Sequence, residues 1–385
     1  MTVPANDLDS VIGSDWQKSV ERRRSEISHR IAGRTDVLLF GAGALGKQVR
    51  HDLLGLPLTP RVFVDNRPDI WGSEIDGLEV LSPEDAARRF GQKALWLITI
   101  YTNSGVKEQC RVLGVPWVTC AELSWVLPKP HPPSLVFGTP EDLAESALEI
   151  IAAASIWADE ESTAEYRSQV RWRFLLDYDA ISPPRPPAET YFPSDLIRPL
   201  AHEVYVDCGA FTGDTIEQFL AAREGKFQRI IAIEPDAASR RALLDRIETW
   251  RRAGVGPMRV EPYAAGFQRG TVRFDATGTV GSSVGSGADT VDVAPLDEIL
   301  AEWKPSYIKF DVEGAEHDAL VGGSTTIRLN MPVLAVSLYH KPEDLWDLPL
   351  LIRSLGPGYR LYLRRYSDER WETVCYAVPI ERLMH

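Results

Sequence analysis

The segment Val204-Tyr-Val-Asp-Cys-Gly-Ala-Phe-Thr-Gly-Asp-Thr215 decides the fold of the second half of the chain. An apolar run ending in Asp207 predicts a buried strand, Gly209 and Gly213 indicate a turn, and a helix is expected to begin near Thr215. The spacing lacks the Gly-Lys-Ser/Thr of a Walker A loop. Glycines let a ligand approach the backbone, the Asp207 carboxylate can hold an ammonium group, and amides at a helix start can meet a carboxylate. The segment therefore indicates a pocket for a zwitterionic cofactor.

Two further predicted strands also end in acidic residues. The run 230–233 ends at Glu234, where a carboxylate can accept hydrogen bonds from two ribose hydroxyls. The run 307–310 ends at Asp311, which Glu313 follows. Because ligands of open parallel sheets bind at the carboxyl ends of strands, these acids are expected in one crevice with Asp207. Taken singly, Asp207 could be a helix cap and Glu234 an exposed turn residue, but acids on consecutive strands favour a site.

The predicted strand at 332–338 delivers His340 to the same edge of the sheet. An imidazole titrates near neutral pH, so His340 is the preferred catalytic base, unless it only caps the strand and bonds Glu343 or Asp344. Asp311 and Glu313 complete the expected catalytic group by orienting an acceptor. Alternatively, Asp311 and His340 share a divalent ion, for which Mg²⁺ or Mn²⁺ would suit the oxygen ligands better than Zn²⁺. No spacing here is diagnostic of a metal, so none is assigned.

The rest of the chain alternates short apolar runs with helical periodicity. This alternation is typical of parallel sheets covered on both faces, so the expected fold class is α/β, with two tandem doubly wound Rossmann-like domains joined by a helical bridge. In the first half the expected strands are 36–41, 61–65, 94–100 and 115–119. In the second half they are 203–207, 229–233, 258–261, 306–310, 332–338, 359–363 and 372–378.

A chain of 385 residues is long enough for two ordinary domains. Prolines at 127–133 and 182–187 indicate linkers, and the apolar spacing over 140–178 predicts helices between them. The expected domains are an N-terminal helical segment (1–33), a nucleotide- or nucleotide-sugar-binding Rossmann-like domain (34–126), the linkers and helical bridge (127–185), and a second α/β domain (186–385).

Composition excludes several classes of partner. A net charge of −13 argues against nucleic acid or an anionic membrane surface, because both need a basic face. The four cysteines form no CxxC pair, so neither a zinc knuckle nor a disulfide scaffold is expected. No signal peptide or apolar run of about 20 residues is visible. The expected protein is cytoplasmic, acts on a small-molecule acceptor, and is compatible with assembly as a homo-oligomer.

A second glycine-rich turn lies near the N-terminus. The apolar run 36–40 leads into Gly41, Gly43 and Gly46, which form a GxGxxG turn before a helix. Asp65 ends the next predicted strand, where it can accept from ribose hydroxyls. Together they indicate a nucleotide site.

This region resembles the nucleotide-sugar-binding Rossmann domain at the start of bacterial sugar N-acetyltransferases, a module that also precedes some methyltransferases. The resemblance covers residues 34–125, and three uses stay open: a nucleotide or nucleotide-sugar ligand, no ligand, or docking of a partner. It rests on Gly41-Ala-Gly-Ala-Leu-Gly46, Val64-Asp-Asn66, Trp71-Gly72, Asp76-Gly77 and Val80-Leu-Ser-Pro83.

The second half resembles the FkbM family of S-adenosylmethionine-dependent methyltransferases, through VDCGAFTGDT (206–215), IAIEPD (231–236) and IKFDVEGAEHDALVGG (308–323). The resemblance covers residues 186–380. It implies a class I methyltransferase fold with a terminal antiparallel hairpin, and methyl transfer to a hydroxyl of a sugar, polyketide or other secondary metabolite. The implied cofactor contacts are Asp207, Gly209, Ala210, Phe211, Gly213, Asp214, Thr215, Glu234 and Asp311, with Ser282 and Ser283 in a polar loop near the adenine.

Three alternatives stay open from the sequence. The acceptor atom could be nitrogen, because the base would be similar. A nucleotide-sugar oxidoreductase could use the first glycine turn, although the Tyr-x-x-x-Lys pair expected of it is absent. A non-catalytic protein that binds S-adenosylmethionine would keep the pocket without needing His340 or Asp311.

Overall fold

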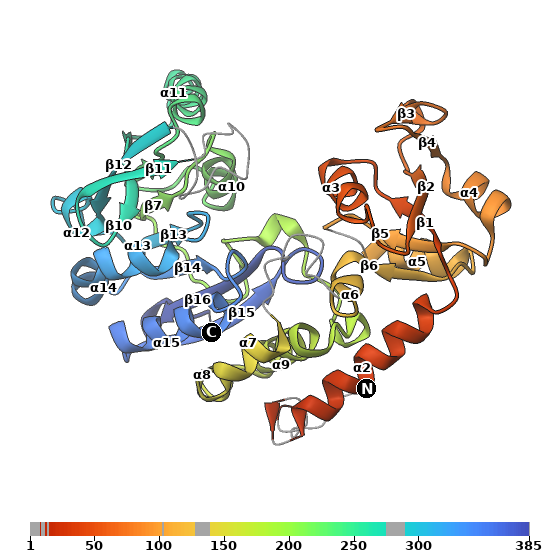
Figure 1. Ribbon diagram of the computed structural model, residues 1–385. Helices are drawn as coiled ribbons and strands as arrows, with labels where there is room; N and C mark the ends of the chain where they lie inside the picture. Colours follow the sequence, from red (N-terminus) through yellow and green to blue (C-terminus); the bar gives the residue numbers. More distant parts are fainter. Residues whose placement is uncertain are drawn as a thin grey trace. The chain divides into compact units, whose positions relative to one another are not determined.

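In a computed structural model, the structure describes residues 8, 12–13, 15–101, 104–127, 139–274 and 289–384 (Figure 1). The chain divides into two compact units. The first unit comprises Met1–Ala147 and Arg167–Ser182, and the second comprises Leu148–Tyr166 and Pro183–His385. Helices α8 (Ala147–Ala153) and α9 (Glu160–Leu175) contain residues of both units. No helix in the described ranges is both long and apolar enough to cross a bilayer.

The first unit is built on a six-stranded sheet in the order β3-β4-β2-β1-β5-β6. All neighbouring strands are parallel except the β3–β4 pair. Val37 and Leu39 of β1 face one apolar core, and Leu38 and Phe40 face the other, so the sheet is buried on both sides. Its strands are β1 (Asp36–Phe40), β2 (Thr59–Val64), β3 (Glu74–Ile75), β4 (Leu78–Leu81), β5 (Leu95–Ile98) and β6 (Trp117–Thr119).

Helices connect the parallel strands of this unit, as a doubly wound fold requires. The predicted N-terminal helix is α2 (Trp16–Ile31), which buries Val20 and Ile27. The other helices are α3 (Ala44–Asp52), η1 (Pro68–Ile70), α4 (Pro83–Phe90), α5 (Ser104–Val112), α6 (Cys120–Ser124), α7 (Pro140–Glu145) and η2 (Tyr178–Ala180).

The second unit contains a seven-stranded sheet in the order β15-β16-β14-β13-β7-β8-β9. Five strands are parallel, and β15 and β16 form the antiparallel hairpin that the resemblance implies. The expected α/β fold class is therefore confirmed. The strands are β7 (Val204–Cys208), β8 (Arg229–Ile233), β9 (Met258–Glu261), β13 (Tyr307–Phe310), β14 (Val333–Ser337), β15 (Tyr359–Arg365) and β16 (Thr373–Pro379).

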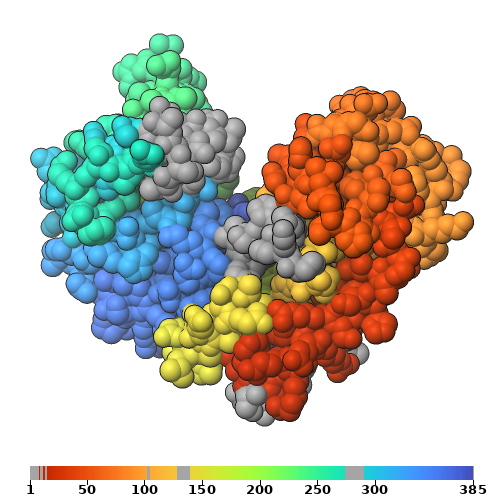
Figure 2. Space-filling model, viewed as in Figure 1, coloured from red at the N-terminus to blue at the C-terminus, as the bar shows by residue number. Residues whose placement is uncertain are grey.

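Two groups of helices cover this sheet. Ile216 and Phe219 of α10 and Leu243 of α11 belong to one apolar core with strand residues, and α11 stands out from the rest of the unit (Figure 2). Helices α13, α14 and α15 pack against one another. The helices are α10 (Asp214–Ala222), α11 (Ala237–Arg252), α12 (Leu296–Ile299), α13 (Glu316–Gly322), α14 (Ser324–Asn330), α15 (Asp344–Leu355), η3 (Pro187–Glu189) and η4 (Ile380–Arg382).

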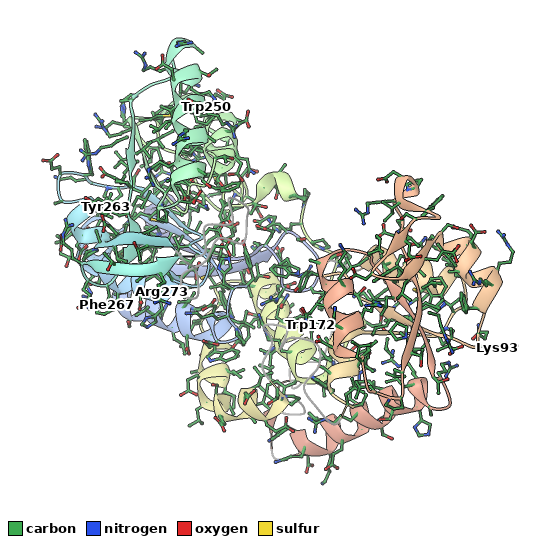
Figure 3. The ribbon with its side chains drawn as sticks, turned by 45° about the horizontal axis from the view of Figure 1, so that its top comes forward. Lys93, Trp172, Trp250, Tyr263, Phe267 and Arg273 are labelled. Carbon is green, nitrogen blue, oxygen red and sulfur yellow. The ribbon has the colours of Figure 1, made fainter. Side chains whose placement is uncertain are left out.

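The sequence did not predict a small second sheet in this unit, in the order β10-β12-β11. Its strands are β10 (Ala264–Gly266), β11 (Gly270–Phe274) and β12 (Asp289–Pro295). Tyr263, Phe267 and Arg273 mark its position in Figure 3. Glycines weaken strand propensity here. Gly322 lets α13 approach β10, because a Cβ on Gly322 would lie 1.9 Å from the Gly266 carbonyl oxygen.

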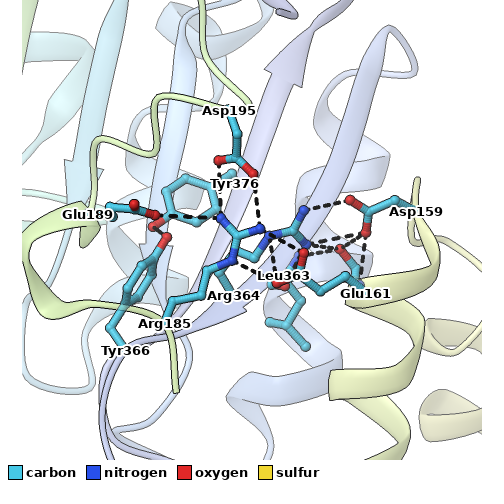
Figure 4. A network of polar contacts seen from close by, with 10 residues as sticks. Asp159, Glu161, Arg185, Glu189, Asp195, Leu363, Arg364, Tyr366 and Tyr376 are labelled. Atoms are coloured by element: carbon cyan, nitrogen blue, oxygen red, sulfur yellow. Dashed lines mark hydrogen bonds and ion pairs between the residues drawn. The ribbon is translucent and has the colours of Figure 1, made fainter. Parts of the chain in front are cut away.

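Ion pairs in the second unit connect Arg364 of β15 with Asp159 and Glu161, and Arg185 with Glu161 and Asp195 (Figure 4). The buried Arg364 guanidinium lies 2.6 Å from Asp159 Oδ2. Arg185 donates to Glu161 at 2.7 Å and to Asp195 at 2.9 Å. Because these contacts join residues far apart in sequence, they fix helical and loop segments to the antiparallel edge of the sheet.

Candidate functional site

A pocket in the second unit lies where the strand order reverses, between β7 and β13. Ligands of doubly wound folds bind at such switch points, beyond the carboxyl ends of the strands. Gly209 follows β7, Glu234 follows β8, and Asp311 follows β13, and all three line the pocket. The carboxyl ends of β7, β8 and β13 therefore meet at one edge of the sheet, as predicted.

The β7–α10 turn forms one wall of the pocket. Gly209 has φ +81°, and a Cβ there would lie 1.9 Å from the Asp311 carbonyl oxygen. Gly213, with φ +88°, faces Leu243 and Trp250 of α11 (Figure 3). Both glycines thus have positive φ and closely approach other parts of the protein, in addition to any approach of a ligand.

Glu234 is held rigidly at the end of β8. Its Oε2 accepts from the Phe211 amide and its Oε1 from the Asp236 amide, each at 2.8 Å. The carboxylate is 6% exposed and lines the pocket. Burial raises its pKa, although the two amide hydrogen bonds counteract this. Each oxygen keeps a further lone pair, so the fixed carboxylate can still accept hydroxyl donors.

Asp207 lies behind the pocket wall. It is fully buried, and its Oδ1 is 3.0 Å from Lys309 Nζ, which also donates to the Gly209 carbonyl oxygen at 2.9 Å. Burial raises the pKa of Asp207 to about 6, and the Lys309 charge opposes that shift. Lys309 lines the pocket, whereas Asp207 does not. Asp207 therefore contributes to the pocket indirectly, through its ion pair with Lys309.

A cluster of charged groups lies at the end of β13. Asp311 Oδ1 accepts from Tyr339 Oη at 3.0 Å. His340 Nδ1 is 2.9 Å from Glu316 Oε1, while its Nε2 is 3.6 Å from Asp311 Oδ1 and 3.5 Å from Glu313 Oε2. Glu316 is fully buried and also accepts from the Val312 amide at 2.8 Å. The carboxylate that bonds His340 is thus Glu316, which begins α13, and not the predicted Glu343 or Asp344.

These contacts set the protonation of His340 and Glu313. Burial lowers the pKa of His340, but the charge and hydrogen bond of Glu316 and the charges of Asp311 and Glu313 outweigh burial and raise it to about 9. Burial raises the pKa of Glu313 to about 7, and the His340 charge opposes that shift. At pH 7 the imidazole holds its proton, and Glu313 is the group of the two that titrates near neutrality.

The structure brings most of the predicted residues of this half to the pocket. His340 does not line it but lies beside Asp311 and Glu313, which do. Ala210 is buried in the apolar core, and Gly213 and Asp207 are also absent from the lining. Ser282 and Ser283 lie outside the described residues. The predicted residues that line it are Gly209, Phe211, Asp214, Thr215, Glu234, Asp311 and Glu313.

Sequence reasoning missed four residues of the site. Lys309 is a charged residue inside an apolar strand, a signal that could have identified it. Glu316 belongs to the quoted motif, but nothing in its spacing indicates contact with His340. Tyr263 and Ala264, which follow β9, also line the pocket, and the sequence showed no acid after that strand.

The glycine turn of the first unit repeats the geometry of the second. Gly41 has φ +124°, and a Cβ there would lie 2.8 Å from the Thr99 carbonyl oxygen, while a Cβ on Gly46 would meet the Gly41 carbonyl at 1.9 Å. Gly43 has open space. Asp65 already accepts from the Ala42 amide and the Arg67 guanidinium, each at 3.0 Å. A nucleotide at this turn stays a prediction.

Known proteins give the second unit a family context. Residues 207–368, less than half of the chain, match the model of the methyltransferase FkbM domain. The crystal structure of methyltransferase FkbM from Methylobacillus flagellatus KT superposes with a TM-score of 0.78 at 23% identity, covering 97% of this chain and 98% of that one. An rRNA methylase from Streptococcus thermophilus gives a TM-score of 0.31 at 12% identity over 50% of this chain and 91% of its own, which supports no argument.

None of the curated proteins compared with the chain matches it. The N-acetyltransferase-like character expected of the first domain has no support among these matches. The protein therefore has the fold of a solved FkbM methyltransferase over nearly its full length, and its second unit carries the match to the methyltransferase FkbM domain.

Proposed function

We propose that the second unit binds S-adenosylmethionine and transfers its methyl group to a hydroxyl of a small-molecule acceptor. One observation carries the proposal: three segments that match the methyltransferase motifs in sequence, at Gly209–Thr215, Glu234 and Asp311–Glu313, contribute to the walls of one pocket. A scaffold that had lost its site would not need these polar groups to converge.

The residues of the pocket fit the parts of this cofactor. The fixed Glu234 carboxylate would hold the ribose hydroxyls, and Ile233, Tyr263 and Ala264 supply the apolar surface that an adenine needs. Asp214 and the start of α10 offer a carboxylate and backbone amides for the amino-acid end. When bound, the cofactor supplies a methyl group on a sulfonium, so the protein has to position the acceptor and remove its proton.

The acceptor side belongs to Asp311 and Glu313. Both carboxylates lie on the pocket wall, where they can bind a hydroxyl and accept its proton, and His340 lies within 3.6 Å of each. Glu316 holds the imidazole ring by its Nδ1 atom and so fixes its orientation. A sugar or another polyol is the favoured acceptor class, because it presents several hydroxyls to paired carboxylates.

Calorimetric titration of S-adenosylhomocysteine tests cofactor binding. We expect saturable binding to the wild-type protein and at least tenfold weaker binding to Glu234→Ala, a loss of about 1.4 kcal/mol. Glu248→Ala is the matched control, because Glu248 only pairs with Arg251 and Arg252 on α11. Folded wild-type protein that binds no S-adenosylhomocysteine would refute the proposal.

Methyl transfer itself is tested by incubating the protein with methyl-labelled S-adenosylmethionine and a panel of nucleotide-sugars and free polyols. We expect label in at least one hydroxyl compound, and loss of that transfer in Glu313→Ala with S-adenosylhomocysteine binding retained. Cofactor binding that survives while amines alone become labelled would move the acceptor atom from oxygen to nitrogen.

A further inference from the structure

Three side chains from separate elements bring donor atoms together next to the pocket. Asp311 follows β13, Glu316 begins α13, and His340 follows β14. One ligand atom from each lies within 4.8 Å of the other two. One imidazole and two carboxylates this close together are typical of a binding site for a divalent metal ion.

Two atoms of this cluster are buried without a hydrogen-bond partner among the residues that the structure describes. Glu316 is fully buried; its Oε1 contacts His340 and the Val312 amide, whereas its Oε2 has no hydrogen-bond partner in the described ranges. The His340 side chain is 8% exposed, and within the same ranges its Nε2 also lacks a hydrogen-bond partner. Buried polar atoms without partners are rare, because each has lost its water. Both atoms belong to residues of the same three-residue cluster, which indicates a missing ligand there.

The separations around His340 also suit a shared ion. Nε2 lies 3.6 Å from Asp311 Oδ1 and 3.5 Å from Glu313 Oε2, too far for strong hydrogen bonds. Two ligands that each lie about 2.1 Å from one ion are roughly 3.0–3.4 Å apart. Small side-chain adjustments would therefore place Nε2 and a carboxylate oxygen around a common cation.

The charge balance favours a cation as well. Asp311, Glu313 and Glu316 surround one imidazole, and Lys309, the other nearby cation, lies closer to Asp207 (3.0 Å) than to Asp311 (3.5 Å). Carboxylates gathered in a partly buried site repel one another unless a positive charge lies among them. The proton of His340 supplies that charge without a metal, and a divalent ion that displaces this proton would supply it on binding.

We propose that His340 Nε2, Asp311 and Glu313 bind a divalent metal ion, while Glu316 hydrogen-bonds His340 Nδ1 and orients the ring. A set of two carboxylates and one imidazole suits a first-row ion such as Mn²⁺, which accepts oxygen and nitrogen ligands. Because Asp311 lines the pocket, the ion would lie at the pocket wall with further positions open to water or an acceptor.

Titration of MnCl₂ into the full-length chain tests the proposal, with unbound Mn²⁺ followed by its electron paramagnetic resonance signal. We expect one tight site in the wild-type protein, and binding at least tenfold weaker in His340→Ala. His317→Ala is the matched control, because His317 is exposed on α13, where its Nδ1 lies 3.5 Å from Asp318 Oδ1. Glu313→Gln, nearly equal in volume, tests a second ligand if His340→Ala fails to fold.

Absence of a stoichiometric Mn²⁺ site in folded wild-type protein would overturn the proposal, as would an unchanged affinity in both His340→Ala and Glu313→Gln. The titration needs neither cofactor nor acceptor. Its failure would therefore leave the proposed methyl transfer standing, and failure of S-adenosylhomocysteine binding would leave the metal site standing.

Discussion

At the scale of single residues, the site depends on groups that are buried and charged. Lys309 separates Asp207 from Asp311, and Glu316 reaches His340 from another element. The strand-end acids Glu234 and Asp311 could be located from sequence, because a strand that ends in an acid before a turn is a local pattern. Lys309 and Glu316 could not be given their roles, because their partners are set by strand pairing and helix position.

Gly209→Ala should destabilise the protein by at least about 2 kcal/mol, because the new Cβ would meet the Asp311 carbonyl at 1.9 Å in addition to adopting a positive φ. Gly225→Ala is the control: its φ is +70° but the space around it is open, so only about 1 kcal/mol is expected. Urea unfolding followed by circular dichroism measures both. Equal losses would contradict the close approach.

Lys309→Met should cost about 3–5 kcal/mol, because it leaves the fully buried Asp207 without its counter-charge. The double variant Lys309→Met/Asp207→Asn should recover part of this loss, since it removes the uncompensated charge as well. A double-mutant cycle from urea unfolding at pH 7 gives the coupling. Additive losses would show that the two residues do not interact.

At the scale of elements, the central parallel strands are well predicted, because buried strands are continuous apolar runs. The runs at 229–233 and 258–261 agree with β8 and β9 to the residue. Strands β3, β4, β10, β11 and β12 were missed. Strands β3, β4 and β10 are short and β11 begins with glycine, whereas β12 alternates polar and apolar residues and forms no continuous apolar run. The network around Arg364 and Arg185 also lies at this scale, since the ion pair of Arg364 with Glu161 joins the start of α9 to β15 (Figure 4).

Asp159→Asn tests that network through pH. Burial raises the pKa of Asp159, but hydrogen bonds from Arg364 and Ser162 outweigh burial and lower it. A carboxylate whose pKa is lower in the folded than in the unfolded protein stabilises the fold at pH values above its unfolded-state pKa, about 3.9. This stabilisation is lost as the pH falls through the folded-state pKa. We expect the variant to lose roughly 1–3 kcal/mol at pH 7 and to approach the wild type as pH falls below about 4.

Urea unfolding at several pH values between 3 and 7 measures this difference. Asp245→Asn, on the exposed surface of α11, should stay within about 0.5 kcal/mol of the wild type throughout. A gap between Asp159→Asn and the wild type that stays constant with pH would show that the carboxylate charge does not stabilise the network.

At the scale of the whole molecule, the chain has two compact units, each with a sheet and apolar cores of its own. Differential scanning calorimetry should therefore resolve two transitions. S-adenosylhomocysteine at 100 times its Kd should stabilise the second unit by about 2.7 kcal/mol and raise the midpoint of one transition. Glu234→Ala should abolish that shift. A single transition that moves as a whole would show that the two units unfold together.

The sequence by itself determined the α/β class, the parallel strands and the edge of the sheet at which the pocket lies. These follow from local patterns, because the carboxyl ends of neighbouring parallel strands share one edge wherever the strands pair. The tertiary structure alone decided that Asp207 lies behind Lys309, that His340 is held by Glu316, and that Tyr263 completes the pocket. The physical reason is that distances between side chains of separate elements depend on register, strand order and helix packing, which residue spacing along the chain does not contain.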